Sequence, residues 1–122
     1  MKGLGIDLCG VERIRQVLEG GDRFLERYYT PEERAYIAGR NKAAAESAAA
    51  MFAAKEAFLK AIGTGLGGVP MTDIGVVHEA SGQPRYALGE KAQARMAQLG
   101  AREAFLSLSH EGGMAAAVCV LE

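Results

Sequence analysis

The chain has 122 residues, 49% of them hydrophobic and 24% charged, which suits one complete hydrophobic core and leaves too little chain for a second full domain. Its 14 lysines and arginines nearly balance its 15 aspartates and glutamates, so the charge argues against nucleic acid or a membrane surface as the partner. Its apolar stretches are broken before the ~20 residues of a membrane span and residues 1–8 lack a secretory pattern, so we expect a cytoplasmic protein.

Residues 3–8 alternate between large apolar residues and residues that are glycine or aspartate, and this period predicts a strand. We expect Leu4, Ile6 and Leu8 on its buried face. Asp7 would then project from the opposite face, which the two glycines leave open. The isolated Cys9, like the second cysteine near the other end of the chain, has apolar neighbours and is expected as a reduced, buried thiol.

Four helical segments are predicted after this strand. Apolar residues at helical spacing indicate a helix over residues 11–19, ended by two glycines, and a short amphipathic turn over residues 22–28. The run Thr30-Pro31-Glu32-Glu33 supplies an N-cap, a proline at the first helical position and a capping-box acid, so a further helix begins there. The alanine-rich stretch 43–62 predicts a long buried helix that Gly63 ends.

The rest of the chain is predicted to contain two β-hairpins separated by a helix, with turn residues between the strands of each hairpin. These elements are expected, in chain order, over residues 74–78, 85–88, 90–99, 104–109 and 114–121. The order contains neither a βαβ unit nor an internal repeat. We therefore expect an α+β fold in which a mainly antiparallel sheet packs against the long helix and shorter helices, as a single domain over residues 1–122.

Two acidic residues occupy settings in which charge is expensive to bury, Asp7 on the first strand and Glu56 inside the long helix. A divalent metal ion bound by both carboxylates would compensate them. The alternative from spacing is that Glu56 pairs with Lys60 at i,i+4 on the helix surface while Asp7 accepts loop hydrogen bonds. Composition does not decide between the two.

Cations and backbone amides come together at the end of the long helix. Lys55, Lys60 and the turn Gly63-Thr64-Gly65 form a candidate anion cradle, although a plain helix C-cap explains the glycines equally well. His110 follows Ser107-Leu108-Ser109 and is a candidate base, a candidate phosphate ligand or simply a hairpin residue.

The first quarter of the chain is locally basic. Its arginines surround Phe24, so this stretch is a candidate docking surface for an acidic helix, and a solvated helix face is the alternative. The arginines are Arg13, Arg15, Arg23 and Arg27.

Three blocks of sequence together resemble the holo-acyl-carrier-protein synthases, the short 4'-phosphopantetheinyl transferases. The blocks are GLGIDL at residues 3–8 followed by Glu12-Arg13-Ile14, FAAKEAF at 52–58 followed by Lys60 and Gly63-Thr64-Gly65, and SLSH at 107–110. They occur in the order and at the separations of that family, and the resemblance covers essentially the whole chain.

The resemblance implies that the 4'-phosphopantetheine of coenzyme A is transferred to a serine of apo acyl carrier protein, with release of adenosine 3',5'-bisphosphate, in support of fatty acid biosynthesis. It implies Mg²⁺ as cofactor, held by Asp7 and Glu56, and two hard carboxylates suit that ion. Lys60, and Lys55 beside it, would stabilise the pyrophosphate, and His110 would contact the nucleotide end. Glu56 and a metal-linked water both remain candidates for the general base.

The resemblance also implies a homotrimer with active sites between subunits, and the apolar stretch 115–121 is too apolar for a solvated edge strand. The acidic carrier would dock on Arg13, Arg23, Phe24 and Arg27.

Two cations that are usual in the family are absent, because Met51 and Gln83 stand at their positions, and Arg40 or Arg85 could replace them. The rival functions are a non-catalytic module that binds coenzyme A or a nucleotide, and a structural subunit with a degenerate site. The set Asp7, Glu56, Lys60 and His110 favours catalysis, because two carboxylates without a metal would repel a phosphate ligand.

Overall fold

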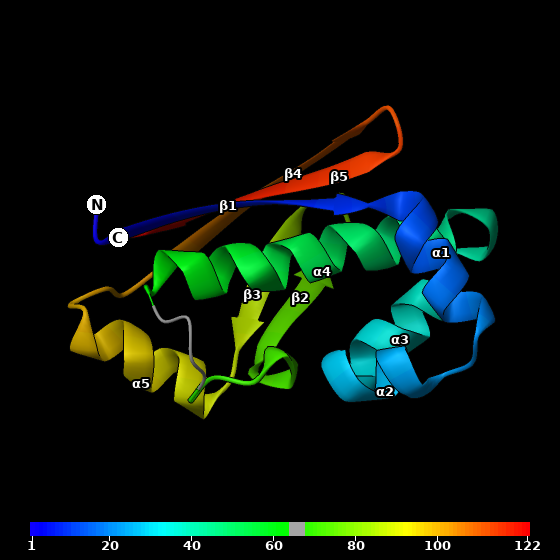
Figure 1. Ribbon diagram of the computed structural model, residues 1–122. Coiled ribbons are helices and arrows are strands. Elements are labelled where there is room, and N and C mark those ends of the chain that lie inside the picture. The colour runs from blue at the N-terminus through cyan, green and yellow to red at the C-terminus, as the bar shows by residue number, and fades with distance from the viewer. Residues whose placement is uncertain (64–67) are drawn as a thin grey trace.

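The computed structural model describes residues 1–63 and 68–122, with the elements in the order expected from the sequence (Figure 1). They are β1 (Gly3–Gly10), α1 (Val11–Glu19), α2 (Arg23–Tyr28), α3 (Pro31–Ala38), the 3-10 turn η1 (Asn41–Ala43), α4 (Ala44–Ala61), the 3-10 turn η2 (Met71–Asp73), β2 (Ile74–His78), β3 (Pro84–Leu88), α5 (Glu90–Gln98), β4 (Ala104–Glu111) and β5 (Met114–Leu121). All strand pairings among the described residues are antiparallel, which confirms the predicted α+β fold.

The strands form two sheets that both pack against the long helix and adjoin where β3 meets β4. In the larger sheet the order is β1-β5-β4, and β2 pairs with β3 in the smaller one. Gly3 lies opposite Leu121, so the two ends of the chain meet at one edge of the molecule (Figure 1). Helix α4 packs against β1 and β5 with one side and against β2 with another, and its buried residues join a single hydrophobic cluster.

Local signals place the helix ends as expected. At the start of α3, the Thr30 side chain accepts a hydrogen bond from the Glu33 amide at 3.1 Å, and the Glu33 carboxylate accepts one from the Thr30 amide at 2.8 Å. This is the predicted capping box, with Pro31 at the first helical position. Gly63 follows α4 with a positive φ of 74°, which a glycine adopts without steric cost.

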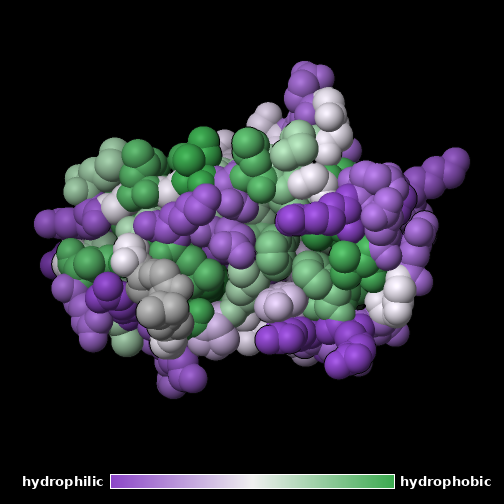
Figure 2. All heavy atoms as spheres, in the orientation of Figure 1, coloured by the Kyte–Doolittle hydropathy of each residue, from purple (hydrophilic) through white to green (hydrophobic). Residues whose placement is uncertain are grey.

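The predicted alternation in β1 is confirmed, but the assignment of its buried face is wrong. Leu4, Ile6 and Leu8 are 57%, 64% and 61% exposed, and Figure 2 shows hydrophobic side chains along β1. The opposite face packs on α4 because its glycines let the two backbones meet. A Cβ at Gly5 would lie 1.9 Å from the Ala57 carbonyl oxygen. Asp7 lies on this inner face, between the buried Gly5 and Cys9.

The last strand is not an edge strand, because β5 runs between β1 and β4. Every second residue of β5 is buried under α4, which explains why the residues of that face are apolar. Cys9 and Cys119 are free and buried, as expected. Among the residues that the structure describes, no helix combines the length and apolar character needed to cross a membrane.

Candidate active site

The contact between β1 and α4 brings Asp7 and Lys60 together from positions 53 residues apart. The Lys60 Nζ donates a hydrogen bond to Asp7 Oδ1 at 2.8 Å and another to the Ile6 carbonyl oxygen at 3.0 Å. The Asp7 side chain is 16% exposed, whereas that of Lys60 is 54% exposed. The pair therefore lies where a buried seam opens to solvent, which a charged ligand can reach.

Glu56 joins this pair from one helical turn earlier in α4 and is half-buried. Burial raises the pKa of Glu56, the negative charge of Asp7 raises it further, and the ammonium of Lys60 opposes both. The hydrogen bond to Asp7 raises the pKa of Lys60. Lys60 therefore bonds the carboxylate of Asp7 on β1 and not that of Glu56, which helix spacing alone would suggest. Asp7, Glu56 and Lys60 form one cluster of three charged groups, drawn from β1 and α4.

Lys55 does not belong to this cluster, so its expected role as a phosphate ligand is wrong. It is fully buried on another side of α4, and its Nζ donates to Glu33 Oε1, the Met71 carbonyl and the Ile74 carbonyl. These three bonds use the three donors of an ammonium group. Lys60 follows Lys55 by five positions, which turns the two side chains to different faces of the helix.

Part of the predicted anion cradle lies outside the described residues. Gly63 is described and exposed at the end of α4, close in sequence to Lys60. Thr64 and Gly65, expected to contact the coenzyme, are not among the residues that the structure describes.

His110 lines a separate cavity of about 240 Å³ between α3, α4, the β2–β3 turn and β4. Its Nε2 lies 3.5 Å from Glu46 Oε1, and Arg40 lines the same cavity. On another wall the rings of Tyr36 and His78 stack at 4.1 Å with an interplanar angle of 3°. This cavity offers the guanidinium of Arg40, the imidazole of His110 and flat rings, which suits a ligand with a phosphate and an aromatic base.

Two residues of this cavity, Tyr36 and His78, were not singled out in the sequence. Burial and the charge of Arg40 lower the pKa of His78, and its Nδ1 has no hydrogen-bond partner among the described residues. Tyr36 lies on α3 and His78 on β2, which meet only in the folded chain, so no local sequence pattern could have identified them.

Arg40, expected as a substitute cation, lines the cavity. Met51 is buried and Gln83 exposed.

The predicted docking residues divide into two places. Arg23, Phe24 and Arg27 line a surface depression of about 550 Å³ on α2, together with Glu26 and Tyr28. The Phe24 ring packs against Tyr28 at 5.1 Å, Phe52 at 5.4 Å and Tyr29 at 5.8 Å. Arg13 is exposed on α1, outside that depression. We refer to Arg23, Phe24 and Arg27 as the basic aromatic surface.

Known proteins match this chain along nearly its whole length. Residues 3–119 match the family described as ACPS, 4'-phosphopantetheinyl transferase superfamily. A holo-[acyl-carrier-protein] synthase of Geotalea daltonii is 44% identical over 122 residues, covering 98% of this chain and 97% of the relative. That of Koribacter versatilis is 49% identical over 123 residues, with the same coverage of 98% and 97%.

Solved structures agree with the sequence matches. The holo-[acyl-carrier-protein] synthase from Neisseria meningitidis has a TM-score of 0.89 and 35% identity, covering 100% of this chain and 98% of that one. The synthase from Helicobacter pylori, solved in complex with coenzyme A, has a TM-score of 0.83 and 30% identity, covering 98% and 99%. The resemblance drawn from the sequence is confirmed: the chain belongs to the holo-acyl-carrier-protein synthase family, within the 4'-phosphopantetheinyl transferase superfamily.

Proposed function

We propose that the protein transfers 4'-phosphopantetheine from coenzyme A to a serine of apo acyl carrier protein, in a Mg²⁺-dependent reaction that releases adenosine 3',5'-bisphosphate. The observation that carries this proposal is the cluster of Asp7, Glu56 and Lys60, which forms where β1 packs on α4 and which solvent reaches at Lys60. Two carboxylates beside an exposed ammonium suit the binding and cleavage of a pyrophosphate. We propose that the reaction serves fatty acid biosynthesis in the cytoplasm, a reducing compartment that suits the two free thiols.

The donor set at this cluster fits a magnesium ion. The Asp7 carboxylate already accepts a hydrogen bond from the ammonium of Lys60. It lies close enough to Glu56 for its charge to raise the pKa of that residue, so the two carboxyl groups are neighbours. Among the described residues no group of three or more histidine, cysteine, aspartate or glutamate side chains could enclose a metal. Mg²⁺ does not need such a cage, because it keeps waters and takes oxygens from substrate phosphates. When bound by Asp7 and Glu56, the ion would neutralise pyrophosphate charge.

The chemical step requires few groups of the protein. The serine oxygen forms a bond to the phosphorus that carries the pantetheine. The bond from that phosphorus to the bridging oxygen of the pyrophosphate breaks, and this oxygen leaves with adenosine 3',5'-bisphosphate. Lys60, which is exposed and protonated, would donate its remaining hydrogen bond to a pyrophosphate oxygen. The serine proton would pass to Glu56 or to a metal-linked water, and both remain candidates for the general base.

The nucleotide end of coenzyme A would occupy the cavity lined by His110 and Arg40. Both side chains can donate to a phosphate, and the stacked rings of Tyr36 and His78 offer a flat apolar wall. The turn Gly63-Thr64-Gly65 stays a sequence-based prediction for binding the phosphates, because Thr64 and Gly65 lie outside the described residues and the Gly63 amide donates to the Lys60 carbonyl oxygen at 3.1 Å.

The carrier protein would dock on the basic aromatic surface and on Arg13. An acidic partner is attracted by Arg23 and Arg27, and the exposed part of Phe24 gives it an apolar contact at the centre. Because Arg13 lies on the helix that directly follows β1, a carrier held there would present its serine toward Asp7.

We further propose a homotrimer with active sites between neighbouring subunits. The outer face of the large sheet carries Leu4, Ile6, Leu8 and the 51% exposed Phe105, and exposed apolar faces of this kind mark interaction sites. Light scattering at micromolar concentration should give the mass of three chains, and Ile6→Glu should lower it. Val17→Glu, on α1, should not. A monomeric mass for the unmodified protein would contradict this assembly.

The activity is tested by incubating the protein with apo acyl carrier protein, coenzyme A and Mg²⁺. Mass spectrometry should detect the phosphopantetheine adduct on the carrier, and excess EDTA should prevent its formation. Exchange of the exposed Glu103 for alanine is the control for loss of a carboxylate elsewhere. Coenzyme A binding without any adduct would instead favour the non-catalytic binding module, and full activity in EDTA would refute the metal requirement.

A further inference from the structure

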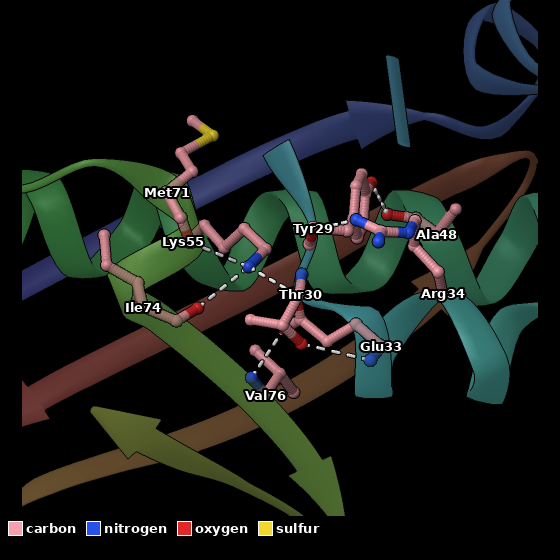
Figure 3. A network of polar contacts seen from close by, with 9 residues as sticks. All are labelled: Tyr29, Thr30, Glu33, Arg34, Ala48, Lys55, Met71, Ile74 and Val76. Carbon is pink, nitrogen blue, oxygen red and sulfur yellow. Dashed lines mark hydrogen bonds and ion pairs between the residues drawn. The ribbon is translucent and has the colours of Figure 1, made fainter. Parts of the chain in front are cut away.

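A buried ion pair connects the start of α3 to α4, the helix that carries Glu56 and Lys60 (Figure 3). Glu33 is 1% exposed and Lys55 is 0% exposed, and their charged groups meet at 2.8 Å. The remaining bonds of Lys55, each 2.9 Å long, go to the carbonyl oxygens of Met71 and Ile74. Through this one ammonium group, α4 is bonded to α3, η2 and the start of β2.

The carboxylate of Glu33 is equally engaged. Its Oε1 also accepts from the Thr30 amide, and its Oε2 accepts from the Val76 amide at 2.7 Å. A buried ion pair is a weak source of stability, because apolar side chains of similar volume often replace it without loss. Such a pair holds its elements in one relative position, since a shift would leave buried charges without partners.

Tyr29 makes a second connection to the same helix. It is 0% exposed, and its hydroxyl donates to the Ala48 carbonyl oxygen of α4 at 2.6 Å. Arg34 in turn donates to the Tyr29 carbonyl at 2.9 Å. The segment between α2 and α3 is therefore attached to α4 at Ala48 and, about two turns further along, at Lys55.

Helix α2 is held through the rings that it packs on its neighbours. It has six residues and buries none of them fully, and Phe24 and Tyr28 both pack against Phe52 of α4. The ring of Phe24 rests on the ring of Tyr29, with centroids 5.8 Å apart. Tyr29 therefore connects the buried network directly to the basic aromatic surface.

We propose that Tyr29 and the Glu33–Lys55 pair are positioning residues for carrier recognition, which hold the basic aromatic surface at a set place relative to Glu56. They touch neither the carrier nor coenzyme A. The proposal rests on the proposed function, because it takes the ligand of that surface to be an acidic carrier protein. Loosening the network should raise the KM for the carrier and leave the KM for coenzyme A unchanged.

The test compares two tyrosine variants. Tyr29→Phe removes the bond to Ala48, and Tyr86→Phe removes a matching bond, because the buried Tyr86 hydroxyl donates to the Ala54 carbonyl of α4 at 2.6 Å from β3. Both should lower thermal stability to a similar extent. Only Tyr29→Phe should raise the carrier KM, by about threefold to tenfold, which is the range that one hydrogen bond covers.

A second measurement follows the position of α2 without any turnover. Amide hydrogen exchange over residues 23–28 should be faster in Tyr29→Phe than in Tyr86→Phe. The paired change Glu33→Gln with Lys55→Met, which leaves no single buried charge, should also speed exchange there and raise the carrier KM.

The outcomes separate this proposal from the proposed function. Equal carrier KM values in the two tyrosine variants, or equal exchange over residues 23–28, would overturn the positioning role. If the unmodified protein forms no adduct, or Arg27→Glu leaves the carrier KM unchanged, the proposed function or its docking surface is wrong. The exchange measurement still decides in that case whether Tyr29 holds α2.

Discussion

The contact between the glycines of β1 and the backbone of α4 is the feature on which the candidate active site depends most directly. In Gly5→Ala the added Cβ would lie 1.9 Å from the Ala57 carbonyl oxygen and 2.8 Å from the Ala61 nitrogen. Contacts below 3.0 Å do not occur, so strand and helix would have to separate by about 1.1 Å. Backbone atoms cannot turn aside as a flexible side chain does. We expect a cost of about 3 kcal/mol, at the upper end of the range for overpacking.

For a domain of this size the cost corresponds to a fall in Tm of roughly 10 °C, measured by circular dichroism. Gly10→Ala is the matched control, because it lies on the same strand and its Cβ would meet nothing closer than 4.0 Å. Separation of the strand from the helix would also move Asp7 away from Glu56, so turnover should fall at temperatures where Gly5→Ala is fully folded. If Gly5→Ala melted within about 1 °C of Gly10→Ala, the close approach of the two backbones would be refuted.

Three further outcomes are expected. Asp7→Ala or Glu56→Ala should lower turnover by about 100-fold or more with little change in Tm, and turnover near that of the unmodified protein would exclude a metal role. Arg13→Glu should raise the carrier KM roughly tenfold, less at high salt, and a loss of coenzyme A affinity instead would assign Arg13 to the nucleotide site. The pKa of His78 lies below its usual 6.5, so the unfolded chain binds the proton more readily and stability falls as the pH drops through that value. His78→Phe, which keeps a ring beside Tyr36, should lose less Tm between about pH 7 and pH 5, and parallel curves would contradict this.

The tertiary contact also explains why the site is assembled from distant parts of the chain. The carboxylate of Asp7 and the ammonium of Lys60 lie far apart in the sequence and come within 2.8 Å because the backbones of β1 and α4 touch. A residue larger than glycine at Gly3 or Gly5 would push the two elements apart. The glycines that first suggested an open strand face are therefore what allows the carboxylates and the ammonium to meet.

The sequence alone determined the features that depend on near neighbours. The helix that begins after Thr30 and the end of α4 just before Gly63 follow from capping and from backbone freedom, and both lie where predicted. The turns of both hairpins and the antiparallel pairing follow from short connections between strands. The three sequence blocks also sufficed to identify the family, because their spacing spans the whole chain.

Only the tertiary structure decided which faces of these elements are covered. Alternation in β1 defines two faces, but it does not say that the glycine face packs on α4 while Ile6 is exposed. In the same way, α4 is alanine-rich on all sides, so its sequence does not show that Lys55 turns inward to Glu33 and Lys60 outward to Asp7. The physical reason is that periodicity describes an element by itself, whereas burial and ion pairing depend on what the rest of the chain places against it.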